Sequence, residues 1–248
     1  MGTIDGDGRV ALVTGGSRGI GAAIARRLAG DGIDVAFTYV RSRERAEEVV
    51  AEVEGRGRRA LSIAADSGDP AAVSDAVEKT VAELGRIDVL VNNAGGFPVG
   101  AIDELGIEDI DRTLAVHVRA ALVAIGAAAP RMEAGGRIIS IGSCFAERVP
   151  YPGLSLYAMS KAALVGLTRG AARDLGERGI TVNVVHPGST DTDMNPADGP
   201  DAAAERAYIA LGHYAEPDDI AATVSHLAGG GGRYITGAAI AVDGGFAA

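Results

Sequence analysis

Short apolar runs rich in Val and Ile alternate with longer segments of helical periodicity along almost the whole chain. We predict strands over residues 10–14, 34–39, 60–64, 89–92, 137–141, 181–186 and 239–242, and helices over about 19–30, 42–55, 69–84, 109–126, 156–177 and 218–228. Strands that are apolar almost throughout are typically buried on both faces, as in a parallel sheet covered by helices. The alternation therefore predicts an α/β fold: a single doubly wound, Rossmann-type domain over residues 1–248, with a parallel seven-stranded sheet flanked by helices.

The segment over residues 188–216 interrupts this alternation. It is acidic, contains Pro196 and Pro200, and follows the end of a predicted strand. Long irregular segments within compact domains are often functional lids. We therefore expect this segment to cover a substrate site.

Charge and composition exclude several classes of partner. The formal net charge is −10 and no basic run is present, whereas nucleic acids and acidic membrane surfaces bind clustered cations. The single cysteine, Cys144, cannot form an internal disulfide, which is typical of the reducing cytoplasm. Residues 1–8 are polar and acidic, unlike a signal peptide, and no run reaches the ~18 apolar residues of a transmembrane helix. We expect a soluble cytoplasmic protein with no nucleic-acid or membrane partner.

A glycine-rich turn, TGGSRGIG at residues 14–21, directly follows the first predicted strand and opens the first predicted helix. Its glycines, Gly15, Gly19 and Gly21, allow a sharp turn, close approach of a pyrophosphate and close packing of the helix. The helix N-terminus then offers free N–H groups to the phosphates. The spacing is wider than G-x-G-x-x-G, and the G-x-x-x-x-G-K-[ST] pattern of NTPases is absent. We predict a dinucleotide site here, the alternative being a purely structural turn.

The end of the second predicted strand indicates which dinucleotide binds. NAD enzymes usually place an acidic residue there to hold the ribose 2′-hydroxyl, but residues 38–43 read TYVRSR. Arg41, Ser42 and Arg18 can instead bind a 2′-phosphate through charge-assisted hydrogen bonds. Alternatively, Arg41 and Arg43 only begin a solvated helix face with the glutamates that follow. The pattern favours NADP(H) over NAD(H).

Tyr157 and Lys161 lie four residues apart in the predicted helix 156–177, and therefore on one face of it. Reduction of a carbonyl group needs a proton donor at the oxygen, and a tyrosine hydroxyl can supply that proton. The ordinary pKa of tyrosine is ~10, and a nearby ammonium group is expected to lower it. Ser143, just past the strand 137–141, can donate a hydrogen bond to the same substrate oxygen.

With these residues in place, the chain resembles the short-chain dehydrogenase/reductase family, in particular its ketoreductases similar to 3-oxoacyl-carrier-protein reductases. The resemblance covers residues 8–246. It rests on TGGSRGIG at 14–21, Asp66, NNAG at 92–95, Ser143, YAMSK at 157–161, Asn183, Pro187-Gly188 and ITGAAIAVDGG at 235–245.

The resemblance implies roles for individual residues. Tyr157 is expected to be the general acid/base, Ser143 to orient the substrate, and Lys161 to tune Tyr157 and hold the nicotinamide ribose. The residues expected to bind NADP(H) are Gly15, Ser17, Arg18, Gly19, Ile20, Gly21, Tyr39, Arg41, Ser42, Asp66, Ser67, Asn93, Ala94, Gly95, Tyr157, Lys161, Pro187, Gly188, Thr190 and Thr192. The family also implies a homotetramer or homodimer, with interfaces on the 109–126 and 156–177 helices.

One position departs from the family. Where its members usually carry an asparagine that supports a water in the proton relay, this chain has His117. A histidine there either relays a proton, since it ordinarily titrates near neutrality, or is an inert packed side chain.

Substrate and mode of action stay open at this point. The substrate is a small ketone or a β-ketoacyl group; Arg178 suits a carrier-docking patch, but the expected second cation is absent near Glu133. The alternative function is that of a weakly catalytic NADP(H)-binding sensor or scaffold. No His, Cys or acidic residues show metal-ligand spacing, so no metal site is predicted.

Overall fold

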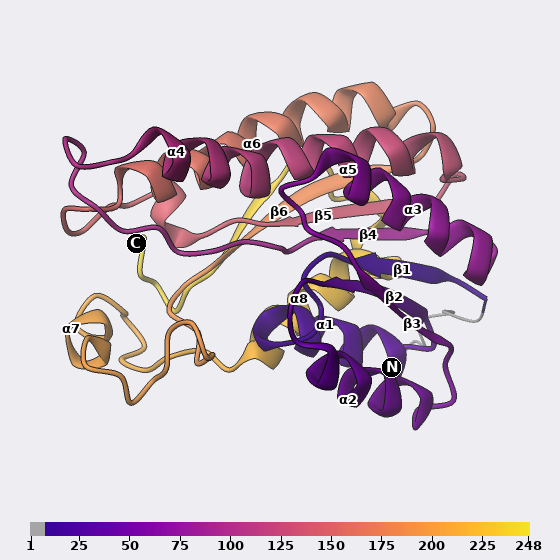
Figure 1. Ribbon diagram of the computed structural model, residues 1–248, viewed down its shortest axis with the longest axis horizontal. Helices are drawn as coiled ribbons and strands as arrows, with labels where there is room; N and C mark the ends of the chain where they lie inside the picture. The colour runs from indigo at the N-terminus through magenta and orange to yellow at the C-terminus, as the bar shows by residue number, and fades with distance from the viewer. Residues whose placement is uncertain (1–7) are drawn as a thin grey trace.

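The computed structural model describes residues 8–248; residues 1–7, which hold most of the amino-terminal segment discussed above, lie outside the described residues. Seven parallel strands form one sheet in the order β3-β2-β1-β4-β5-β6-β7 (Figure 1). The strands are β1 Val10–Val13, β2 Asp34–Tyr39, β3 Ala60–Ala64, β4 Val89–Asn92, β5 Arg137–Ile141, β6 Thr181–Pro187 and β7 Ala239–Val242. The chain winds outward from β1 in both directions, which confirms the predicted doubly wound fold. In such sheets the crevice between the strands at this reversal binds ligands.

Helices cover both faces of the sheet (Figure 1). On one face lie α1 (Gly19–Gly30), α2 (Arg43–Glu54) and α8 (Pro217–Ala228), and on the other α3 (Pro70–Leu84), α5 (Ala120–Ala128) and α6 (Ser155–Gly176), with α4 (Ile107–Leu114) beside α6. Strand β1 shows why each face has its own core. Its side chains alternate, so that Ala11 and Val13 enter one apolar cluster and Val10 and Leu12 the other.

The helical path from Ile107 to Arg131 is longer than the predicted helix 109–126. It consists of α4, a π turn over Ala115–Arg119, α5 and a final 3-10 turn. By length and composition this path suffices to cross a membrane, although half of its most apolar window is buried inside the protein. Its apolar residues do not form one uninterrupted run, because Arg119 lies among them. Since α5 packs on α3 and β4, this is a core helix of the domain.

The segment over residues 188–216 contains a short helix that the sequence pattern does not predict, α7 (Ala202–Arg206). In Figure 1, α7 stands apart from the two helical layers. A bridge between Thr190 and Ala215 joins the two ends of the segment. Glu205 connects three other residues of the segment, because its Oε2 accepts hydrogen bonds from the side chains of Ser189, Asn195 and Tyr214.

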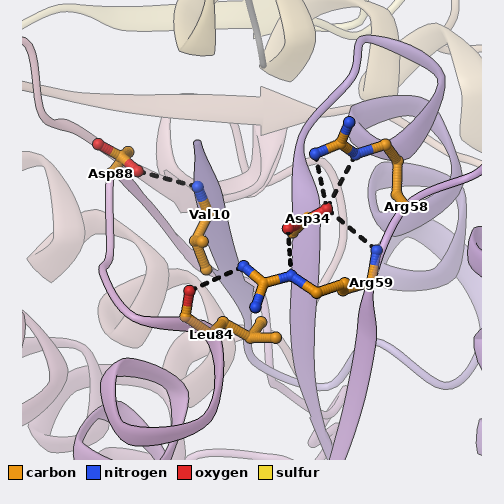
Figure 2. A network of polar contacts seen from close by, with 6 residues as sticks. All are labelled: Val10, Asp34, Arg58, Arg59, Leu84 and Asp88. Carbon is orange, nitrogen blue, oxygen red and sulfur yellow. Dashed lines mark hydrogen bonds and ion pairs between the residues drawn. The ribbon is translucent and has the colours of Figure 1, made fainter. Parts of the chain in front are cut away.

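The amino edge of the sheet, opposite the crevice, is held by buried carboxylates (Figure 2). Asp34, the first residue of β2, receives hydrogen bonds at 2.8 Å from Arg58 and 2.7 Å from the side chain of Arg59. Asp88, just before β4, accepts the main-chain N–H of Val10 at 2.9 Å. These contacts fix the starts of the four neighbouring strands β3, β2, β1 and β4 and so position their carboxyl ends.

Candidate active site

A cleft of about 770 Å³ opens at the carboxyl edge of the sheet. All residues predicted to bind the cofactor line it, together with Ser143. His117 is the exception among the predicted site residues, because it lies behind the wall of the cleft in a small cavity that it shares with Lys161. Residues from distant parts of the sequence therefore meet where the strand order reverses.

The glycine-rich turn at one end of the cleft requires glycine at three positions. Gly15 and Gly19 have φ angles of +68° and +53°, which L-residues with side chains rarely adopt. A Cβ on Gly21 would lie 2.3 Å from the carbonyl oxygen of Gly15. Gly19, Ile20 and Gly21 form the first turn of α1 and line the cleft, and the first N–H groups of a helix have no partner within it. The turn thus fits a phosphate group.

Asn93 and Thr14 brace this turn against β4. The side-chain amide of Asn93 donates to the carbonyl oxygens of Thr14 and Gly15, at 2.9 Å and 3.0 Å. The Thr14 hydroxyl accepts the N–H groups of Asn93 and Ala94. Asn93, one of the residues expected to bind NADP(H), lines the cleft, but its amide is already used to hold the turn. Thr14 belongs to the quoted motif, yet the sequence does not reveal this task.

Cationic side chains line the part of the cleft next to the carboxyl end of β2. Arg18, Arg41 and Ser42 line it as expected, and Arg45 from α2 joins them. Arg45 was missed because it reads as one of several charges on a solvated helix face. It forms an ion pair with Asp193 of the 188–216 segment, and Arg18 lies 4.0 Å from the same carboxylate. The site is therefore basic, with an acidic residue of the neighbouring segment already in contact.

Asp66 also lines the cleft, after β3, but it is held by an ion pair. Its carboxylate accepts hydrogen bonds from Arg112 of α4 at 2.9 Å and 3.1 Å, and from the N–H of Gly68 at 2.8 Å. The hydrogen bonds from Arg112 and Gly68 lower the pKa of Asp66. This carboxylate is thus a fixed, charged acceptor in the cleft wall.

Ser143, Tyr157 and Lys161 come together at the middle of the cleft, from the end of β5 and the first turns of α6. The Nζ of Lys161 donates to the carbonyl oxygen of Ile141 at 3.0 Å and lies 5.7 Å from the centre of the Tyr157 ring. The main-chain N–H of Ser143 donates to Nδ1 of the buried His186 at 3.0 Å. His186 thereby holds Ser143 in place, a role that its position at a strand end does not reveal.

The protonation of this group differs from the expectation. Burial raises the pKa of Tyr157 to about 12, although a hydrogen bond with Ser143 acts in the opposite direction. Burial also lowers the pKa of Lys161 to about 8. The net shift is thus opposite to the expected lowering, because burial outweighs the opposing hydrogen bond. Tyr157 is consequently a protonated acid near neutral pH.

His117 lies in the π turn and is buried. Its Nε2 accepts the main-chain N–H of Gly96 at 2.9 Å, so the ring proton is assigned to Nδ1, which lies 2.8 Å from the Ser160 hydroxyl. Ser160 in turn donates to the carbonyl oxygen of Tyr157 at 2.7 Å. Burial, assisted by the charge of Lys161, lowers the pKa of His117 to about 3. The ring is therefore neutral at pH 7, unlike a histidine that titrates near neutrality, and both its nitrogens have partners.

The far end of the cleft is lined by Phe97, Phe145, Met194 and Glu205. No sequence motif marks these residues, and the positions of Met194 and Glu205 depend on the fold of the 188–216 segment. Cys144, next to Ser143 in the chain, also lines the cleft and is buried, and burial raises the pKa of its thiol to about 12. The thiol is thus protonated and no candidate nucleophile. Within residues 8–248, no group of three or more His, Cys, Asp or Glu side chains is arranged to hold a metal ion.

Comparison with known proteins gives the following likenesses. Residues 15–247 match the family described as enoyl-(acyl carrier protein) reductase. A short-chain dehydrogenase from Burkholderia cenocepacia, solved in complex with NADP, is 59% identical, with 98% of this chain and 99% of that chain covered and a TM-score of 0.97. The 3-oxoacyl-(acyl-carrier-protein) reductase FabG of Staphylococcus aureus is 38% identical over 95% of this chain and 96% of its own length. The cyclic-di-GMP-binding biofilm dispersal mediator protein of Escherichia coli is 44% identical over 97% and 98%, respectively.

Proposed function

The chain belongs to the short-chain dehydrogenase/reductase family, and from this premise we propose that it reduces a small ketone with NADPH, or catalyses the reverse alcohol oxidation, with Tyr157 as general acid/base. The observation that carries the proposal is the meeting of Ser143, Tyr157 and Lys161 in the cleft that also holds the glycine-rich turn. A protein that only binds a nucleotide has no need for this trio beside it.

The cofactor of this reductase is NADP(H). The relative from Burkholderia cenocepacia is solved with NADP, and the residues present here fit that dinucleotide. The glycine-rich turn lines the cleft at the first turn of α1, where it can take up the pyrophosphate, whereas Arg18, Arg41 and Arg45 supply positive charge for the 2′-phosphate. Bound NADPH supplies a hydride to the substrate carbon.

The protein side chains then handle the proton. Ser143 donates a hydrogen bond to the substrate carbonyl oxygen, and the Tyr157 hydroxyl delivers its proton to that oxygen as negative charge develops there. A tyrosine with a pKa of about 12 is fully protonated near neutrality and so is ready for reduction. Lys161, largely an ammonium at pH 7 with a pKa of about 8, stabilises the phenolate that remains.

His117 acts as a positioning residue in this scheme rather than as a proton relay. The neutral ring connects the loop after β4, through Gly96, to Ser160 on the catalytic helix. Ser160 is bonded to the carbonyl of Tyr157, so the ring helps to fix the orientation of the general acid. A group with a pKa of about 3 does not take up protons in the working pH range.

The segment over residues 188–216 serves as the substrate lid. It carries Met194 and Glu205 into the cleft, and Thr192 faces Gly19 of the glycine-rich turn across it. The bridge from Thr190 to Ala215 makes the segment a closed unit. Such a unit can move as one body about its two ends.

We further propose a cytoplasmic homotetramer or homodimer. Half of the most apolar window of the 107–131 path is not buried within the chain, and Leu122 on α5 is 58% exposed. Exposed apolar helix faces of this kind are typical of subunit interfaces. Light scattering coupled to size exclusion should give the mass of two or four chains.

Replacement of Tyr157 by Phe tests the proposal. We expect Tyr157→Phe to reduce turnover of a ketone by roughly 10²–10⁴-fold, the range of general acid catalysis. NADPH affinity, measured by fluorescence titration, should stay within about twofold because the hydroxyl is the only group removed. Tyr234→Phe, at a 97% exposed site, is the matched control. Unchanged turnover in Tyr157→Phe contradicts the proposed role.

A second candidate is a catalytically weak NADP(H)-binding sensor. The 44% identical biofilm dispersal mediator, whose name describes it as cyclic-di-GMP-binding, favours it. Calorimetric titration of the purified protein with cyclic di-GMP distinguishes the two. Micromolar binding without NADPH oxidation across a panel of ketones would favour the sensor, and turnover without such binding the reductase.

A further inference from the structure

Aromatic side chains are scarce in this chain and yet concentrated at one place. The chain has six Tyr, four Phe and no Trp, and the rest of its core is mainly aliphatic. Six of these ten residues form one connected network of ring contacts: Phe97, Phe145, Tyr151, Tyr157, Tyr208 and Phe246. Packing of the sheet does not account for this concentration, because both main apolar clusters manage with very few aromatic rings.

Three of the rings face the cleft where the reaction is proposed to occur. Phe97 and Phe145 line the cleft together with Tyr157. The rings of Phe97 and Phe145 are stacked at an angle of 25° with their centres 6.1 Å apart, and Phe97 meets Tyr157 edge to face at 4.8 Å. Phe97 is still 37% exposed. It therefore presents ring surface to whatever enters beside the Tyr157 hydroxyl.

The remaining rings hold this wall rigid. Phe145 is contacted by Tyr151 at 5.8 Å and by Phe246 at 5.4 Å, both nearly perpendicular, and Tyr208 packs on Phe246 from outside. Phe246 is completely buried. A wall fixed in advance loses little freedom when a ligand ring packs on it, which increases affinity.

The charges at the aromatic end of the cleft disfavour a carrier-bound substrate whose connecting arm bears a phosphate group. Glu205 and Asp193, two acidic residues of the 188–216 segment, line the cleft. Nearby, Arg148 is engaged with the carbonyl oxygen of Phe246 at 2.6 Å. Arg178, the residue that suits a carrier-docking patch, donates to two main-chain carbonyls and follows the far end of α6, about 30 Å along the helix from Tyr157.

We propose that the substrate is a small aryl ketone, whose ring packs against Phe97 and Phe145 while its carbonyl oxygen meets Ser143 and Tyr157. This inference rests on the proposed ketoreductase function and specifies its substrate class. Offset-stacked and edge-to-face contacts with two rings give an aryl group an advantage over a saturated ring of the same size.

A matched pair of ketones tests this, acetophenone and cyclohexyl methyl ketone, which share one carbon skeleton. We expect Phe97→Leu to lower the ratio of their kcat/KM values about tenfold relative to the unmodified protein. Acetophenone, as a conjugated ketone, is intrinsically less reactive than cyclohexyl methyl ketone. This difference cancels when the ratio of kcat/KM values is compared between variants. Tyr234→Leu, which removes a 97% exposed ring outside the network, should leave the ratio unchanged.

A second measurement does not depend on turnover. In the NADP⁺-loaded protein, which has no hydride to give, saturation-transfer NMR should detect acetophenone binding more strongly than cyclohexyl methyl ketone, and Phe97→Leu should abolish the difference. Selective binding without turnover of any ketone would support the aryl site and overturn the ketoreductase. Turnover or binding without ring preference, or faster reduction of an acetoacetyl thioester than of acetophenone, would overturn the aryl site.

Discussion

The two edges of the same sheet treat buried charge in opposite ways. At the amino edge, the buried carboxylate of Asp34 lies between the guanidinium groups of Arg58 and Arg59 (Figure 2). At the carboxyl edge, the buried ammonium of Lys161 has a main-chain carbonyl as its hydrogen-bond partner, and no carboxylate within ion-pair distance in residues 8–248. A paired buried charge serves the fold, whereas an unpaired one is costly and marks a place where chemistry needs it.

The pKa values follow this difference. Burial alone would raise the pKa of Asp34, but hydrogen bonds from Arg59 and the charge of Arg58 outweigh it, and the pKa is lowered. At the other edge nothing opposes burial to the same extent, so the pKa of Lys161 falls to about 8 and that of Tyr157 rises to about 12. Burial thus disfavours the charged form at both edges, and at the amino edge the hydrogen bonds and charges of Arg58 and Arg59 outweigh it.

The largest expected effect comes from removing the unpaired charge. Lys161→Met should reduce kcat/KM by roughly 10²-fold or more, since the phenolate of Tyr157 loses its cation. The free energy of unfolding at pH 7 should stay constant or increase, because a buried ammonium is replaced by an apolar chain of similar length. Ketone reduction assays and urea unfolding measure the two quantities. A large loss of stability in Lys161→Met would show that the buried charge at the carboxyl edge stabilises the fold, as Asp34 does at the amino edge.

The pH dependence of unfolding sharpens this prediction. The pKa of Lys161 is lower in the folded protein than the ~10.4 of an unfolded lysine, so the unfolded state binds more protons between about pH 8 and pH 10. Stability therefore rises with pH across that window. Lys161→Met should lack this contribution, and identical slopes in both proteins would contradict the assignment.

At the amino edge we expect the reverse result. Asp34→Asn leaves Arg58 and Arg59 without their shared carboxylate, at a cost of about 2–3 kcal/mol in unfolding free energy, reduced from the buried-pair value because Arg59 is 57% exposed. The kcat/KM value should stay within about twofold. Since the pKa of Asp34 is lowered, its contribution is present above ~pH 4 and is lost on acidification, so the variant should lose less stability in acid. If Asp34→Asn lost catalytic activity while its unfolding free energy stayed unchanged, the proposed difference between the two edges would be wrong.

A smaller effect is expected at His117, a buried polar group that belongs to the carboxyl edge but is fully paired. His117→Ala should lower kcat about tenfold by loosening Tyr157, while His117→Asn, the residue usual in the family, retains part of the activity. The wild-type pH profile should show no step of this residue between pH 6 and pH 8, because its pKa is about 3. A step near pH 6.5 that disappears in both variants would reinstate the proton relay.

The sequence predicts much of the fold and the cleft, because the carboxyl edge is built from contiguous motifs. Near-continuous apolar strands imply burial of the sheet on both faces. The function of the TGGSRGIG turn follows from its position between a predicted strand and a predicted helix. The protonation of His117 follows instead from burial in a π turn, a feature that helical periodicity does not reveal. The raised pKa of Tyr157 likewise follows from burial of its hydroxyl, which spacing along a helix leaves open.

The roles of other residues could not be predicted from the sequence, because they depend on partners that are distant along the chain. Arg58 and Arg59 look like solvated charges in the sequence, and only the register of β2 and β3 brings them to Asp34. Glu205 reads as part of an acidic lid surface, yet it is buried and holds three donors of its own segment. Motifs predict residues that act next to their neighbours in sequence, and long-range pairs need the folded chain.

The smallest expected effect concerns an exposed pair at the carboxyl edge, where both kinds of charge meet. Asp193 contacts Arg45 and Arg18, the cations proposed to bind the 2′-phosphate, and therefore competes with it. Asp193→Asn should tighten NADPH binding by about two- to threefold in low salt and leave NADH binding unchanged, with the gain disappearing in high salt as exposed charges are screened. Fluorescence titration of both dinucleotides measures this, with Asp198→Asn in the same segment as control. Equal changes for NADH and NADPH would mean that Asp193 shapes the segment rather than the phosphate site, and the carboxyl edge would then contain a structural ion pair like the one at Asp34.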